Sequence, residues 1–157
     1  MERFQHYIGT PSGVVLCVNQ MEKNNLRGCF YHAYSREAVP VTCFNDLWFK
    51  MEELFDAIHF PFPGTEERSF IGKRRKNPEK QETVGALERK KVMSEEEMLN
   101  KHGDLGTFIV RVQHRQNSTW QGKVTWVDEN KTMQFRSVWE LTKLIAAALD
   151  TTSMQEE

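Results

Sequence analysis

The sequence predicts an α+β fold of two pseudo-repeated βββα units, in which antiparallel sheets are packed by helices. Three observations support this prediction. Short segments alternate between apolar and polar residues, which is the period of a β-strand. Two longer segments carry apolar residues at helical spacing, and the same order of segments occurs twice along the 157 residues.

The repeat is visible when the segment that begins at Val14 is set against the one that begins at Phe108. The matched pairs are Val18/Val112, Leu26/Trp120, Gly28/Gly122 and Phe30/Val124 at an offset of 94 residues, then Phe44/Phe135, Leu47/Val138, Trp48/Trp139 and Ala57/Ala148 at an offset of 91. The change of offset predicts three extra residues in a turn near residues 35–40 of the first unit. Duplication of one ancestral unit explains the match, and chance similarity of two such units is the alternative.

In the first unit, alternation predicts strands that carry Val14, Phe30 and Val41. A helix is predicted to follow, with Asp46 at its N-cap and Pro61 as its stop. Alternation places Val14 and Phe30 on the face of the strands that the helix covers, and Val41 on the opposite, outer face.

The segment between the units, residues 61–104, is charged and poor in apolar periodicity, which is typical of a linker. One short helix is predicted at residues 94–103, because Ser94 and Glu97 fit a capping box and Gly103 suits the end.

In the second unit, strands are predicted at residues 108–113, 120–128 and 132–135, separated by polar turns. Ser137 and Glu140 form a capping box at the start of the final helix, and residues 151–157 are predicted to be a flexible tail.

Gly28 and Gly122 stand at equivalent points just inside the second strand of each unit. A glycine there indicates a bulge or a place where another backbone comes close; contact with a ligand is the alternative.

The outer face of the first unit is predicted to be too apolar for open solvent. The residues proposed to form a protein-interaction surface there are Cys17, Cys29, Tyr31, Val41 and Cys43. Residues 60–71, the N-terminal stretch RFQHYI or a second subunit are expected to cover it, and an exposed small-molecule groove is the alternative.

Positive charge gathers between residues 73 and 91, where eight cations face three anions, a net charge of +5 on a chain whose net charge is −1. Such a cluster attracts phosphates, or neutralises an acidic body. The candidate nucleic-acid contacts are Lys73, Arg74, Arg75, Lys76, Arg89, Lys90 and Lys91, with Arg111 and Lys123 on the outer face of the second unit. The four tryptophans are expected in the core, with Trp120 partly exposed; a base-stacking platform is the alternative.

The sequence predicts no catalytic residues, no metal site and no cofactor. Its five histidines stand in no nucleophile arrangement, and it contains no phosphate-binding glycine loop. The three cysteines lack the close spacing of zinc ligands, and their odd number fits reduced thiols. The apolar runs are too short to cross a membrane and no signal peptide is evident, so a cytoplasmic protein is expected.

Two resemblances add to these expectations. The stretches FIVRVQHRQNSTWQGKVTWVDENKTMQFRSVWELTKLI and GCFYHAYSREAVPV resemble segments of small uncharacterised proteins of anaerobic Firmicutes, which implies a bacterial protein and no particular activity. The order of three strands and a helix is similar to antitoxin domains of the HicB type, which bind a partner toxin and often DNA. That likeness is one of layout alone.

The predicted organisation is a first βββα unit at residues 1–60, a charged linker with a short helix at 61–104, a second unit at 105–150, and the tail. Because the scaffold is duplicated and lacks a catalytic constellation, we expect a non-enzymatic binding or regulatory protein that acts through protein–protein contacts or self-association. The alternative is a nucleic-acid-binding protein that uses the basic centre.

Overall fold

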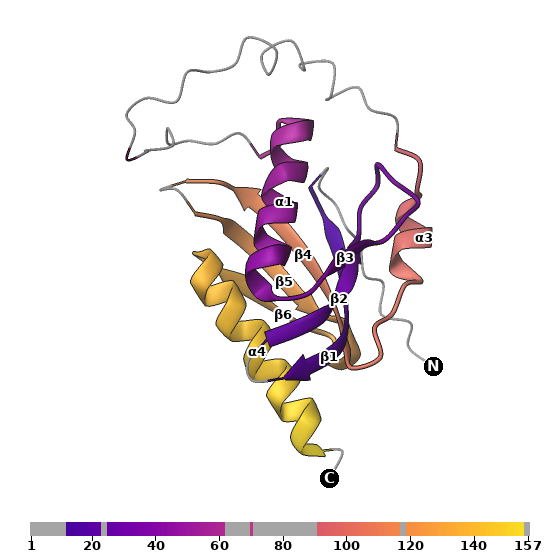
Figure 1. Ribbon diagram of the computed structural model, residues 1–157, viewed down its shortest axis with the longest axis vertical. Coiled ribbons are helices and arrows are strands. Elements are labelled where there is room, and N and C mark those ends of the chain that lie inside the picture. Colours follow the sequence, from indigo (N-terminus) through magenta and orange to yellow (C-terminus); the bar gives the residue numbers. More distant parts are fainter. Residues whose placement is uncertain (1–11, 23–24, 62–69, 71–90, 117–118, 156–157) are drawn as a thin grey trace.

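The computed structural model describes residues 12–22, 25–61, 70, 91–116 and 119–155, and it describes residues 151–155 as backbone only. These residues form an α+β fold, as the sequence predicts, with one antiparallel sheet and helices packed against it (Figure 1). The elements in chain order are β1 (Val14–Glu22), β2 (Asn25–Tyr31), β3 (Val39–Val41), α1 (Phe44–Ile58), α3 (Glu95–Leu99), β4 (Gly106–His114), β5 (Gln121–Trp126), the 3₁₀ turn η2 (Val127–Glu129), β6 (Lys131–Phe135) and α4 (Val138–Gln155).

Six strands of the described residues join in one sheet, in the order β3–β2–β1–β4–β5–β6. Each neighbouring pair is antiparallel. The central pair, β1 and β4, joins the N-terminal half (β1–β3 and α1) to the C-terminal half (β4–β6 and α4). Its register sets Val14 opposite Val110, Val15 opposite Ile109, and Leu16 opposite Phe108. The two halves therefore share a single sheet.

Gly28 on β2 and Gly122 on β5 lie against the backbone of the neighbouring strand. A Cβ atom at Gly28 would collide with the carbonyl oxygen of Cys17, and one at Gly122 would collide with that of Arg111. In each strand pair the register also shifts one or two residues beyond the contact, which is a bulge. The predicted close approach of backbones is confirmed at both glycines.

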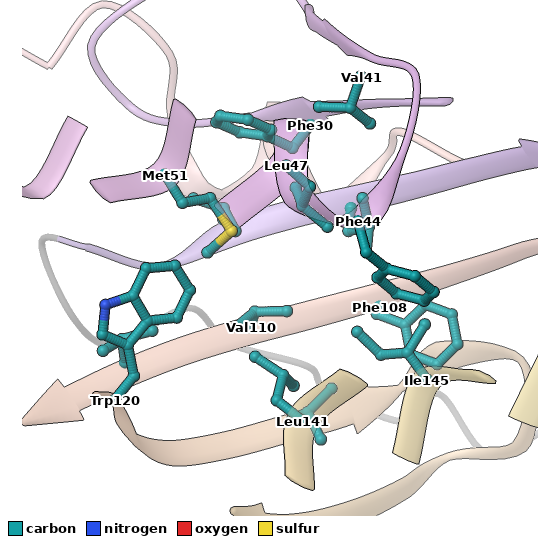
Figure 2. Packing of buried hydrophobic residues seen from close by; sticks show 14 of the residues in the cluster. Phe30, Val41, Phe44, Leu47, Met51, Phe108, Val110, Trp120, Leu141 and Ile145 are labelled. Atoms are coloured by element: carbon teal, nitrogen blue, oxygen red, sulfur yellow. The ribbon is translucent and has the colours of Figure 1, made fainter. Parts of the chain in front are cut away.

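Helices α1 and α4 cover the same side of the sheet, which we call the helix face; the other side is the outer face (Figure 1). Figure 2 shows Leu47 and Met51 of α1, and Leu141 and Ile145 of α4, gathered around Val110 of β4. These five side chains are fully buried. Burying a side chain of this size contributes about 1.5–3 kcal/mol, so this layer is the main source of stability.

The two helices begin with similar caps. Ser137 accepts a hydrogen bond from the backbone N–H of Glu140 at 3.0 Å, and this predicted cap is confirmed. In the first unit the prediction of Asp46 as N-cap is wrong, because Cys43 is the N-cap and its Sγ accepts from the N–H of Asp46 at 3.3 Å. Asp46 instead accepts from the N–H of Thr42, the residue that precedes the N-cap.

The buried positions of the two helices match at an offset of 94 residues rather than 91. Among the described side chains, those that are 0% exposed are Leu47, Met51 and Phe55 in α1, and Leu141, Ile145 and Leu149 in α4. The sequence match between Trp48 and Trp139 therefore does not reflect like positions. Trp48 is half-buried, whereas 67% of Trp139 is exposed.

The same three-residue error put Val41 on the wrong face of the sheet. Val41 lies opposite Gly28 in the β2–β3 register, as Phe135 lies opposite Gly122 in the β5–β6 register. Both side chains are buried on the helix face, and Figure 2 shows Val41 beside Phe30. Side chains alternate along a strand, so an odd shift in alignment reverses the predicted face.

On the outer face, α3 covers the middle of the sheet. Met93 and Met98 pack on Val15, Cys17 and Ile109 of β1 and β4. Among the described residues, this cover comes from the segment at 92–99 of the same chain, within the predicted linker. The N-terminal stretch RFQHYI and most of residues 60–71, which were expected to cover this face, lie outside the described part of the chain. The predicted cap of this helix is confirmed: the N-cap Ser94 accepts from the N–H of Glu97 at 3.1 Å.

Helix α4 continues to Gln155, five residues into the segment predicted to be a tail. Across the described residues, no helix is both long and apolar enough to span a bilayer.

Candidate protein-interaction site

The five residues proposed as an apolar interaction surface do not form one surface. Cys17, Cys29 and Tyr31 lie together on the outer face, in the cluster that α3 covers. Val41 is in the core of the helix face, and Cys43 caps α1. Only 2% of Cys17 is exposed. Helix α3 of the same chain therefore covers much of the surface that was predicted to bind a partner.

The thiol of Cys17 on the outer face is protonated at physiological pH. Burial raises the pKa of Cys17 to about 12, and Cys29, which lies opposite it on β2, adds to the rise while Lys101 opposes it. Burial and then the same Cys29 raise the pKa of Tyr31. A thiol is nucleophilic as the thiolate, so Cys17 is poorly suited to covalent catalysis.

The candidate nucleic-acid contacts divide into three groups. Residues 73–76, 89 and 90 lie outside the described part of the chain. Lys91 is exposed, just before the segment that leads to α3. Arg111 and Lys123 lie opposite each other on β4 and β5, but only Lys123 is exposed; the guanidinium of buried Arg111 donates to the hydroxyl of Thr125 at 3.1 Å.

The tryptophans do not form a stacking platform. Trp120, predicted to be partly exposed, is buried, and its indole N–H donates to Glu52 at 2.6 Å. Trp48 stands edge-on to Trp120 and donates to the hydroxyl of Thr142 of α4 at 3.1 Å. Trp139, predicted to lie in the core, is exposed and lies beside an open hollow of about 480 Å³ between the starts of α1 and α4.

An ion network around buried Arg115, which no sequence pattern indicated, ties α1 to the β4–β5 hairpin. Arg115, 4% exposed, donates to Glu52 at 2.9 Å and to Asp56 at 2.8 Å, and its Nε donates to the carbonyl of Pro61 at 2.5 Å. Glu52 also accepts from Trp120. The hydrogen-bonded residues of this network are 54 to 68 positions apart in the sequence, so no local pattern predicts their contact. Both carboxylate oxygens of Glu52 are engaged, one by Arg115 and one by Trp120, which indicates a structural role.

The two edge strands of the sheet, β3 and β6, differ in whether they can accept a further strand. At one edge, β3 has three residues, with Pro40 at its centre, and Lys50 donates to the carbonyl of Pro40 at 2.6 Å. Proline removes a donor and the lysine occupies an acceptor, so this edge is closed to further strands. Such protection is common at the edges of natural sheets.

At the other edge, β6 is open. It has five residues without proline, and its first four residues are all exposed. Among the residues that the structure describes, none pairs with its outer side. Met133, at the centre of β6, has 55% of its surface exposed. An exposed edge with an apolar residue is the feature through which sheets accept another strand. The sequence does not indicate this edge, because the alternation that predicts a strand does not reveal which strands lie at the edge of a sheet.

In the described residues, His, Cys, Asp and Glu side chains do not gather in threes as a metal-binding group. Comparison with protein-family models, with curated proteins and with solved structures finds no match to this chain.

Proposed function

We propose that this protein is a non-enzymatic binding or regulatory protein that acts through protein–protein contacts, and that it receives an extended protein segment along β6. The observation that carries the proposal is the contrast between the two edges of the sheet. Proline, short length and the hydrogen bond from Lys50 close β3, whereas β6 has no proline and no described residue pairs with its outer side. Main-chain hydrogen bonds give such a site affinity, and alternate side chains give it specificity.

We also infer that the chain is a duplicated βββα unit with a constant offset of 94 residues. The supporting pairs are the two glycine contacts, the two bulges, the caps Cys43 and Ser137, and the buried positions of α1 and α4. A further pair is long-range: Asn25 accepts from the N–H of Phe44, and Thr119, 94 residues later, accepts from the N–H of Val138. Chance similarity does not account readily for matching side-chain caps of this kind.

Duplication bears on function because it makes β3 and β6 counterparts. Counterpart edges would start from the same backbone plan, yet β3 has a central proline and accepts a hydrogen bond from Lys50, whereas β6 has no proline. A sheet that needed only to remain monomeric would gain from protection at both edges. The open β6 edge is therefore best explained as a binding edge.

A site-specific crosslink tests this function. A photo-crosslinking residue at Lys131 on β6 is expected to give one protein adduct in cells, mapped by mass spectrometry to an extended segment. The matched control places the same residue at Phe49 on α1, which is 71% exposed. Met133→Lys on β6 should abolish the adduct. An adduct that persists in that variant, or that forms equally from position 49, contradicts the proposed site.

Nucleic-acid binding is the second candidate function, supported by exposed Lys123 on an outer face that carries polar Thr132 and Gln134 beside it. A mobility-shift assay across salt concentrations tests it. Binding should weaken steeply with salt and when residues 73–76 are neutralised. Binding that is absent at low salt rejects this function.

A further inference from the structure

We propose that the segment received by β6 is β6 of a second copy of this chain, paired antiparallel about a twofold axis through Met133. The inference rests on the proposed function, because it names the partner of the same edge. It would extend the sheet continuously from one protomer to the other.

The sequence of β6 suits pairing with itself. A twofold axis through Met133 is the register that pairs all five residues of Lys131–Phe135 with all five of the copy. In that register Met133 lies opposite Met133, Thr132 opposite Gln134, and Lys131 opposite Phe135. Like charges therefore do not face each other, although the strand carries a lysine. The exposed methionine meets its own counterpart and loses contact with water.

Helix α4 supplies a second apolar element beside Met133. Phe135 is buried on the helix face, so alternation puts Met133 on that face too. Helix α4 turns Thr142 toward α1, where it accepts from Trp48. Half-buried Leu144 lies two residues on, about 200° around the helix, and so on the flank away from α1. A twofold axis at β6 would bring Met133 and this flank of α4 from both copies into one apolar cluster.

The closed β3 edge determines what kind of assembly results. In the described part of the chain each copy has one open edge, so pairing of β6 with β6 occupies it in both copies. The contact is isologous and closes at a dimer, whereas a β6–β3 contact would propagate into filaments. Two five-residue strands bury less than the roughly 1,200 Å² of a standard interface, so we expect a weak dimer that depends on concentration.

Sedimentation of the full chain between about 5 μM and 1 mM tests the dimer. We expect a monomer–dimer equilibrium whose dissociation constant rises at least about tenfold in Met133→Lys, because two cations then face each other at the axis. Met133→Glu should do the same, and an equimolar mixture of the two variants should restore a dimer. Phe49→Lys, the same change at an exposed apolar residue of α1, should leave it unaltered.

Disulfide trapping tests the register. Directly opposed residues have Cα atoms about 4.5–5.5 Å apart, within the range for a disulfide, so Met133→Cys should form a covalent dimer under mild oxidation. Thr132→Cys is the control, because its Cα atom lies about 7–8 Å from its counterpart in the copy. Faster crosslinking at position 132 than at 133 contradicts the proposed axis.

The outcomes separate this inference from the proposed function. A chain that stays monomeric at 1 mM, or a dimer insensitive to Met133→Lys, overturns pairing through β6 of a second copy. If the crosslink from Lys131 then still reaches a different protein and still depends on Met133, the proposed function stands with another partner. If that crosslink also fails, both are wrong.

Discussion

The two halves of the sheet share several local features and differ in the residues that meet their surfaces. In both, a glycine allows close contact with the neighbouring strand and a capped helix covers the core. On the outer face, the N-terminal half carries Cys17 and Tyr31 beneath α3, whereas the C-terminal half carries exposed Lys123 and Gln134. Both halves therefore have the glycine contact and the capped helix, while their side chains differ where each half meets a different environment.

The largest expected effect tests the shared backbone plan. Gly28→Ala and Gly122→Ala should each destabilise the protein by about 3 kcal/mol or more, because the new Cβ meets a carbonyl oxygen that cannot move without disturbing the strand. Urea unfolding measures the loss. Gly106→Ala is the control, since the nearest atom to its Cβ is a methyl of the Leu149 side chain, and it should cost much less. Similar losses at all three sites would contradict the argument.

The second prediction tests the cover that distinguishes the N-terminal half. Met98→Ala should cost about 2–4 kcal/mol in the same assay, because Met98 is 1% exposed and packs on the outer face. It should also speed modification of Cys17 by thiol reagents. Val92→Ala, in the same segment but exposed, should change stability by less than about 0.5 kcal/mol. If Met98→Ala behaves like Val92→Ala, α3 does not cover the sheet in solution.

The sequence could reveal features that arise from neighbours along the chain. The caps at Ser94 and Ser137 and the two glycines follow from local patterns, and the structure confirms them. The face of Val41 was mispredicted because few residues are identical between the halves. The sequence therefore allowed an offset of 91 or of 94 residues for this segment, and only the strand register decides between them.

Features that depend on the strand order could not be predicted at all. Arg115 meets Glu52 and Asp56 only because β4 lies under α1. In the sequence, nothing distinguishes Arg115 from the other arginines. The open edge at β6 likewise follows from the order of the sheet, since a half-exposed strand in the middle of a sheet would show the same alternation.

The third prediction uses the buried thiol that the C-terminal half lacks. Folding holds Cys17 protonated, with its pKa raised from about 9 to about 12. Between these values the unfolded chain loses the proton and the folded chain keeps it, so stability should fall as pH rises from 9 toward 12. Urea midpoints at several pH values measure this fall. Cys17→Val should make it shallower, and equal slopes in the two proteins would show that Cys17 is not the group responsible.

The smallest expected effect compares the two helix caps. Sulfur is a weak acceptor, so Cys43 caps α1 less well than Ser137 caps α4, although each accepts from the residue three positions ahead. Cys43→Ser should therefore stabilise the protein by about 0.5–1 kcal/mol, and Ser137→Cys should destabilise it by a similar amount. Urea unfolding of both variants measures the pair. Changes in stability of opposite sign and similar size would show that the two caps work in the same way. If both exchanges destabilise the protein, the two caps are not interchangeable, and each helix start is fitted to its own surroundings.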